Sequence, residues 1–249
     1  MNKTEIINLL HTIEKNENIE IVYACESGSR TWGFANDQSD WDIRFIYKKL
    51  DLNEYLSLTK QKDVIEYMGD DVDIVGWDIK KALMMHYKNN PNLREYLNSD
   101  IVYINKGIAD VFAGLGGFEI GVLMNHYSAI AAKDWKKYCS LGFKKEKSKK
   151  YLHVVRSILC WQLLKRDIYP PINIHDLLNH DFINLEEDIK ESINDLISFH
   201  QDCGKITEET IFILNNFILD SLSYMKKVKV KSFKNTDDYN KRFQELLLG

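Results

Sequence analysis

The feature that most constrains this chain is a glycine-serine pair, Gly28-Ser29, which is followed by two aspartates spaced by one residue, Asp40 and Asp42. A β-rich run at 19–24 leads directly into the pair. Glycine tolerates a tight turn and close backbone approach, and the serine offers a hydroxyl and an amide N–H to an anion. The pattern predicts a strand that turns at Gly28 and returns toward an acidic segment.

The segment after the turn, 42–47, also reads as a strand. Alternate side chains of a strand share a face, so we expect Asp40, Asp42 and Arg44 to point the same way and the residues between them to face the core. Two carboxylates on one strand face can hold a divalent cation, and Mg²⁺ prefers such hard oxygen ligands. The arrangement therefore predicts a metal and phosphate site.

Two metal ions about 3.5–4 Å apart, as in two-metal phosphoryl sites, require a third carboxylate. Asp73 is the best candidate, because it is an acidic residue in an otherwise apolar strand. Asp70 and Asp71 sit beside a glycine and look like turn residues. Asp78 precedes an apolar helical stretch and is expected to cap it.

These residues and their neighbours resemble the polymerase-β-type nucleotidyltransferase superfamily. The likeness extends to a bacterial and phage family of predicted nucleotidyltransferases, one branch of which is described as RNA-repair-associated. The stretches that carry it are 26–33, 39–47, 73–78, 90–91, 99–103, 150–156 and 170–171, which together span most of 20–180. The resemblance implies an α/β (α+β) nucleotidyltransferase head with a mixed sheet, followed by an all-α helical bundle.

The resemblance also implies a reaction: metal-dependent transfer of a nucleotidyl group from a nucleoside triphosphate, with two Mg²⁺ ions or, alternatively, Mn²⁺. The catalytic and metal-binding residues it implies are Asp40, Asp42 and Asp73. The candidate nucleotide-binding residues are Gly28, Ser29, Arg30, Arg44, Lys149, Lys150 and Arg156.

The basic candidates have plainer interpretations. Arg44 could be an ion-pair partner of the carboxylates, and Arg30 an exposed helix residue. Lysines in a helical run usually form a solvated face, and on a helix Arg156 shares a side with Lys149 better than with Lys150.

Charge is distributed unevenly along the 249 residues, although the net charge is only −4. Residues 1–105 hold 12 Lys/Arg and 18 Asp/Glu, whereas 133–150 contains eight lysines. A chain with this balance lacks a general basic coat for nucleic acid. The acceptor therefore has three alternatives. An RNA 3′ end would suit the lysine-rich helices, and a small molecule would suit the acidic head. A protein hydroxyl is the third. A non-catalytic nucleotide-binding regulatory module is the alternative from another class.

Hydrophobic spacing predicts two domains, a catalytic domain at 1–106 and a helical domain at 107–249. Strands are expected at 19–24, 42–47, 64–68, 72–77 and 101–104, and helices at 2–14, 79–88, 92–97, 118–138, 147–166, 185–199, 208–226 and 237–247. Pro170-Pro171 is expected to end the helix at 147–166. No apolar run reaches the roughly 20 residues of a membrane span, and the four cysteines are scattered, as in a cytoplasmic protein.

Overall fold

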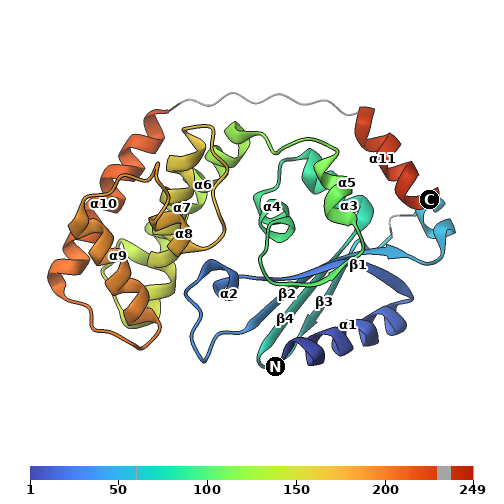
Figure 1. Ribbon diagram of the computed structural model, residues 1–249, viewed down its shortest axis with the longest axis horizontal. Helices are drawn as coiled ribbons and strands as arrows, with labels where there is room; N and C mark the ends of the chain where they lie inside the picture. Colours follow the sequence, from blue (N-terminus) through green and yellow to red (C-terminus); the bar gives the residue numbers. More distant parts are fainter. Residues whose placement is uncertain (60, 229–236, 249) are drawn as a thin grey trace. The chain divides into compact units, whose positions relative to one another are not determined.

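The computed structural model describes residues 1–59, 61–228 and 237–248 (Figure 1). The described residues form two compact units. The first unit holds 1–31, 39–118 and 237–248, and the second holds 32–38 and 119–228. The functional division expected at residue 106 stays a prediction.

The first unit is built on a five-stranded sheet with the order β3-β4-β2-β1-β5. Its strands are β1 (Ile19–Ser27), β2 (Trp41–Lys49), β3 (Val64–Met68), β4 (Val72–Asp78) and β5 (Val102–Asn105). β2 and β4 are parallel and the other neighbours antiparallel, which confirms the expected mixed sheet. The parallel pairing sets Asp42 opposite Asp73, because the β3–β4 hairpin returns β4 in the direction of β2.

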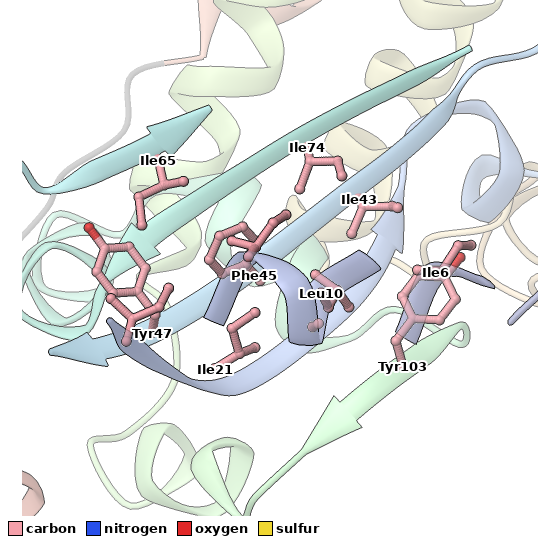
Figure 2. Close-up of a cluster of buried hydrophobic side chains, with 12 residues drawn as sticks. Ile6, Leu10, Ile21, Ile43, Phe45, Tyr47, Ile65, Ile74 and Tyr103 are labelled. Carbon is pink, nitrogen blue, oxygen red and sulfur yellow. The ribbon is translucent and has the colours of Figure 1, made fainter. Parts of the chain in front are cut away.

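One face of this sheet is covered by α1 (Lys3–Glu17), whose apolar stripe packs on the strands (Figure 2). Ile6 and Leu10 of α1 are fully buried against strand residues such as Ile43 and Phe45. The helix begins where Asn2 and Glu5 form a reciprocal capping box. Burial of Ile43 and Phe45 confirms that the residues alternating with Asp42 and Arg44 face the core.

The remaining elements of the first unit are short. They are α2 (Ser29–Trp32, which runs into the second unit), the 3₁₀ turn η1 (Leu52–Leu56), α3 (Ile79–Tyr87), α4 (Pro91–Leu97), α5 (Ile108–Ala113) and α11 (Asp237–Leu248). Pro91 is the first residue of α4, a position that lacks an intrahelical N–H partner anyway, so the proline begins this helix. The sequence pattern did not indicate α5 or η1.

The second unit is helical throughout its regular elements. They are α6 (Ile120–Asp134), the π-helical turn η2 (Trp135–Cys139), the 3₁₀ turn η3 (Lys145–Lys147), α7 (Ser148–Leu164), α8 (Ile174–Leu178), α9 (Glu187–His200) and α10 (Glu208–Lys227). The expectation that Pro170-Pro171 ends α7 was wrong. α7 ends at Leu164, and the chain reverses at Asp167, which has a left-handed φ of 61°.

Residues 32–38 belong to the second unit, although the residues before and after them in the sequence belong to the first. Phe34 is fully buried there and its ring lies 6.0 Å from the ring of His200. Asn36 donates to the carbonyl of His200 at 3.2 Å, and Gln201 donates to the carbonyl of Ala35 at 3.2 Å. The segment is therefore an integral part of the helical unit, although it separates Ser29 from Asp42 in sequence.

Two composition-based expectations concern the whole chain. In the part that the structure describes, no helix is both long enough and apolar enough to cross a membrane. Cys25, Cys139 and Cys160 are buried, as the scattered spacing suggested, and Cys203 is exposed.

Candidate active site

The turn after β1 lies directly against Asp42. Gly28 has a left-handed φ of 67°, and a Cβ atom placed on it would lie 2.1 Å from Oδ2 of Asp42. Only glycine fits this position, because any side chain would overlap the carboxylate. Thr31 Oγ1 donates to the carbonyl of Gly28 at 3.0 Å and so closes the turn. The backbone of the turn therefore lies directly against the Asp42 carboxylate, and its approach to a phosphate stays a prediction.

Ser29 begins α2 and is nearly completely buried. Its Oγ atom has no hydrogen-bond partner among the residues that the structure describes. A buried hydroxyl without a partner loses its hydration and gains nothing in return, so such atoms call for an explanation. A phosphate oxygen beside the turn would supply the acceptor that this hydroxyl lacks.

Asp42 and Asp73 are brought together by the parallel register of β2 and β4. The Arg44 guanidinium bridges them, with one nitrogen 3.0 Å from Oδ1 of Asp42 and 2.8 Å from Oδ2 of Asp73. The same side chain donates to the carbonyl of Asp73 at 2.8 Å. Two neighbouring carboxylates repel each other, and a shared cation relieves this repulsion. In this structure that cation is Arg44.

Arg44 keeps its charge despite being partly buried. Burial by itself lowers the pKa of Arg44, but the electrostatic influence of Tyr96, Asp73 and Asp42 outweighs it and raises the pKa. Of the two interpretations of Arg44, the structure displays the ion pair with the carboxylates, and a contact with phosphate stays a prediction.

Asp40 is placed differently from the other two aspartates. It precedes β2, is exposed, and its backbone carbonyl accepts a 3.3 Å hydrogen bond from Arg30. Arg30 also donates to the carbonyl of Ser39 at 2.7 Å, and its guanidinium lies 3.8 Å from the centre of the Trp41 ring. Arg30 therefore braces the approach to β2, and its proposed contact with nucleotide stays untested.

The carboxyl competitors of Asp73 have the structural roles expected of them. Asp70 and Asp71 lie in the turn between β3 and β4. Asp78 caps α3, where its Oδ1 accepts from the backbone N–H of Lys80 at 2.8 Å. The prediction of a cap at Asp78 is confirmed.

The fit of these residues to a divalent cation rests on Asp42 and Asp73. Oδ1 of Asp73 is buried and has no hydrogen-bond partner among the described residues, and the side chain as a whole is 29% exposed. A carboxylate oxygen without a donor would be satisfied by a cation beside it, and Mg²⁺ prefers such oxygen ligands. Across the described ranges, however, no three acidic, histidine or cysteine side chains are grouped as a metal would require. Asp42 and Asp73 fit a shared cation, and the participation of Asp40 stays a prediction.

A buried carboxylate that sequence reasoning missed lies behind Asp42. Glu26 is fully buried, and its carboxylate accepts from the backbone N–H of Asp42 at 2.8 Å and from the Tyr103 hydroxyl at 2.6 Å. Ser99 Oγ donates to the Glu26 carbonyl at 2.8 Å. Burial, and to a lesser extent the charge of Asp42, raise the pKa of Glu26, although the hydrogen bonds from Tyr103 and from the Asp42 N–H act to lower it. Glu26 thus anchors the backbone at Asp42, and its position at the end of an apolar strand was the available signal.

The three basic candidates from the helical part lie on or at the start of α7, in the second unit. Arg156 is only 5% exposed; its Nε donates to the carbonyl of Ile172 at 3.0 Å, and its guanidinium lies 5.0 Å from the Trp32 ring. Lys149 and Lys150 are half-buried, and Lys150 Nζ lies 4.9 Å from the Tyr138 ring. These contacts account for Arg156 as a packing residue, and nucleotide binding by any of the three stays a prediction.

A glycine-serine turn lies against Asp42, and Asp42 is paired with Asp73 across parallel strands, which fits the polymerase-β-type nucleotidyltransferases that the sequence resembles. Comparison with known families agrees: a family model described as the RNA repair pathway DNA polymerase beta family matches residues 2–248. The chain belongs to this family, and it is a nucleotidyltransferase by class. The family supports nucleotidyl transfer as the general reaction and a divalent metal as its general requirement.

Two similar proteins give little beyond this. The uncharacterized protein YcgL of Bacillus subtilis (strain 168) is 34% identical over 255 residues, covering 99% of this chain and 95% of its own. A solved nucleotidyltransferase-like protein from Exiguobacterium sibiricum 255-15 matches with a TM-score of 0.37 and 12% identity, covering 98% of this chain and 87% of its own.

Proposed function

We propose that the protein transfers a nucleoside monophosphate group from a nucleoside triphosphate to an acceptor hydroxyl, with release of pyrophosphate. The observation that carries the proposal is the pairing of Asp42 with Asp73 beside the Gly28 turn. Positioning and charge neutralisation supply most of the acceleration in such reactions, and no covalent intermediate with the protein is needed.

Each part of the site has a role in this proposal. The backbone at Gly28 and the hydroxyl of Ser29 hold the triphosphate, and Asp42 and Asp73, together with Asp40, hold the metal ions. When bound, Mg²⁺ or Mn²⁺ lowers the pKa of the acceptor hydroxyl and neutralises phosphate charge. Arg44 leaves the carboxylates as the substrate binds and turns its charge toward phosphate.

Asp73 takes the proton of the acceptor hydroxyl, directly or through water. The hydroxyl oxygen then forms a bond to the α-phosphorus, and the bond from that phosphorus to the oxygen bridging toward the β-phosphate breaks. The electron pair stays with pyrophosphate, which carries the negative charge away. Glu26 acts only as a positioning residue here, because it holds the Asp42 backbone and contacts no reacting atom.

The test is to incubate the protein with each α-³²P nucleoside triphosphate, in Mg²⁺ or Mn²⁺, with a pool of RNA, small molecules and protein, and to find where the label goes. Label should appear in one acceptor class and should depend on the metal. Binding of nucleotide by calorimetry without any transfer of label would instead favour the regulatory-module alternative.

Asp70→Asn is the matched control for this experiment. Asp70 carries the same functional group close to Asp73 but lies in the β3–β4 turn, so Asp70→Asn should transfer label at the normal rate. Equal loss of transfer in Asp70→Asn and Asp73→Asn would contradict the assignment of the site. The separate labelled nucleoside triphosphates also identify the preferred nucleotide, and a cytoplasmic location is a further expectation.

A further inference from the structure

A pocket in the second unit lies between the end of α7, the loop at 182–184 and the end of α10. Its volume is about 230 Å³. This is below the roughly 300–1,000 Å³ of sites that enclose a drug-sized ligand, so it suits one ring system of a larger ligand. The pocket is separate from the aspartate site, because all of its lining residues belong to the second unit.

Most walls of this pocket are formed by residues of α7 and α10 that share one face of their helix. Ile158, Trp161 and Lys165 follow one stripe at the end of α7, and Tyr224 and Met225 lie at the end of α10. Ile158, Trp161 and Met225 are buried and form an apolar floor. The Trp161 and Tyr224 rings meet edge to face, with centroids 5.8 Å apart, which fixes the inner wall.

The rim combines exposed aromatic rings with cations. Phe182 is 50% exposed and Tyr224 is 47% exposed, so about half of each residue's surface is open to a ligand at the pocket. Lys165 Nζ lies 4.5 Å from the Tyr224 ring and contacts its hydroxyl, and the Arg166 guanidinium lies 5.9 Å from the Phe182 ring. Each ring is thus accompanied by a positive charge.

No acidic side chain is among the residues that line this pocket. Within the described part of the chain, neither Lys165 nor Arg166 pairs with a carboxylate. The other polar side chains at the lining are neutral ones, Gln162, Asn184 and Ser221, which can both donate and accept hydrogen bonds.

A larger cavity in the first unit, of about 560 Å³, is a useful contrast. It is lined by charges of both signs, and two of its lysines are already paired, Lys49 with Glu54 and Lys81 with Asp63. An anionic ligand would meet carboxylates there. The smaller pocket offers positive charge and aromatic surface without that repulsion.

From these observations we infer that the pocket between α7 and α10 binds single-stranded nucleic acid, with one base against Phe182 and Tyr224 and the adjoining phosphates on Lys165 and Arg166. Aromatic rings that stack bases, combined with cations that follow the backbone, are what single-strand binding requires. If the pocket holds the acceptor of the proposed transfer, that acceptor is a nucleic acid strand. This acceptor role rests on the proposed function. Binding itself takes place without nucleoside triphosphate.

The first test measures binding of fluorescently labelled 12-nucleotide RNA and DNA strands of one sequence to the full chain by anisotropy. Phe182→Ala with Tyr224→Ala should weaken binding about 10-fold or more, because stacking contributes about 1–3 kcal/mol per base. Tyr224→Phe keeps the ring and should bind normally, which separates the ring from the hydroxyl, and circular dichroism confirms that the double alanine variant is folded. The RNA and DNA arms identify which strand is bound.

The second test concerns the two cations. Lys165→Glu with Arg166→Glu should reduce the slope of log affinity against log salt by about 1.4, since each phosphate contact on a single strand contributes about 0.7. Lys3→Glu with Lys205→Glu makes the same change in net charge at two other exposed sites, and its slope should match that of the unaltered protein.

Three outcomes would overturn the inference: unchanged affinity in the double alanine variant, equal slopes for the two charge variants, or inorganic polyphosphate that competes as well as the strand. The last would mean that charge alone is recognised. Because Asp42→Asn leaves this pocket intact, it should still bind the strand, so failure of transfer and failure of binding are distinguishable.

Discussion

The acidic residues of the first unit and the basic residues of α7 in the second are held in opposite ways. Asp42 and Asp73 are fixed by strand register and bridged by Arg44, whose one positive charge offsets part of their negative charge, and they keep partial access to solvent. Arg156 is buried, donates a hydrogen bond to the backbone carbonyl of Ile172, and places its guanidinium over the Trp32 ring. The carboxylates of the first unit therefore remain partly open to solvent, whereas the Arg156 guanidinium of α7 is enclosed by the packing of its own unit.

The comparison would break most visibly at Asp42. Asp42→Asn should lower nucleotidyl transfer by at least about 100-fold, because it removes a carboxylate that holds the metal ions, which neutralise the phosphate charge. The measurement is incorporation of α-labelled nucleotide, with circular dichroism to confirm the fold. Near-normal transfer by a folded Asp42→Asn protein would show that the aspartate pair has another purpose.

Substitutions of Arg156, Lys149 and Lys150 test whether the basic residues of α7 contribute to stability. Arg156→Ala should lower the free energy of unfolding by about 2–3 kcal/mol, since it removes packing and leaves the Ile172 carbonyl without its donor. Lys149→Ala and Lys150→Ala should each change it by less than about 0.5 kcal/mol. Urea unfolding measures all three. A stable Arg156→Ala protein with impaired nucleotide binding would instead support contact between this arginine and phosphate.

A third change tests whether Arg44 stands in for a bound cation. Arg44→Gln should lower the free energy of unfolding by about 1–2 kcal/mol without divalent ions, because it leaves two carboxylates facing each other. Added Mg²⁺ should then raise the melting temperature of this variant more than that of the unaltered protein.

Arg30→Gln is the control for that measurement. Arg30 donates to backbone carbonyls, and among the described residues it forms no ion pair with a carboxylate, so its loss should leave the Mg²⁺ response unchanged. Identical Mg²⁺ responses in the Arg44 and Arg30 variants would contradict the stand-in role.

The smallest expected effect concerns Glu26 and pH. Because folding raises its pKa, the folded protein binds a proton there more tightly than the unfolded chain does. The contribution of Glu26 to the free energy of unfolding is complete below its pKa in the unfolded chain. It is lost as pH rises through its higher pKa in the folded protein. The unaltered protein should therefore lose stability relative to Glu26→Gln as pH rises from acid toward neutral. Urea unfolding across this pH range measures the difference, and parallel curves would contradict it.

Most of the sheet could be predicted from sequence, because strands report their faces through alternation. The burial of Ile43 and Phe45 beside Asp42 and Arg44 follows from that rule alone. The limits of a strand depend on its partners, however. β2 begins at Trp41, whose N–H donates to the carbonyl of Asp71 at 2.9 Å, and Asp40 is left outside the ladder.

The rest of the site depended on contacts between distant residues. The bridge from Arg44 to Asp73 spans 29 positions in the chain, and nothing local to either residue indicates it. The role of Glu26 likewise needs Tyr103, which is 77 positions away. On α7 the sequence showed a helix with basic residues, but the burial of Arg156 arises because nearly the whole circumference of the helix is covered.

The path of residues 32–38 has a practical consequence for anyone who wishes to divide this molecule. A fragment ending near residue 118 would carry Phe34 without the histidine that now shields it, and a fragment starting near 119 would have a hole where that ring belongs. A chimaera that takes its helical part from a relative would therefore also have to take residues 32–38 from that relative, because this heptapeptide packs within the helical unit.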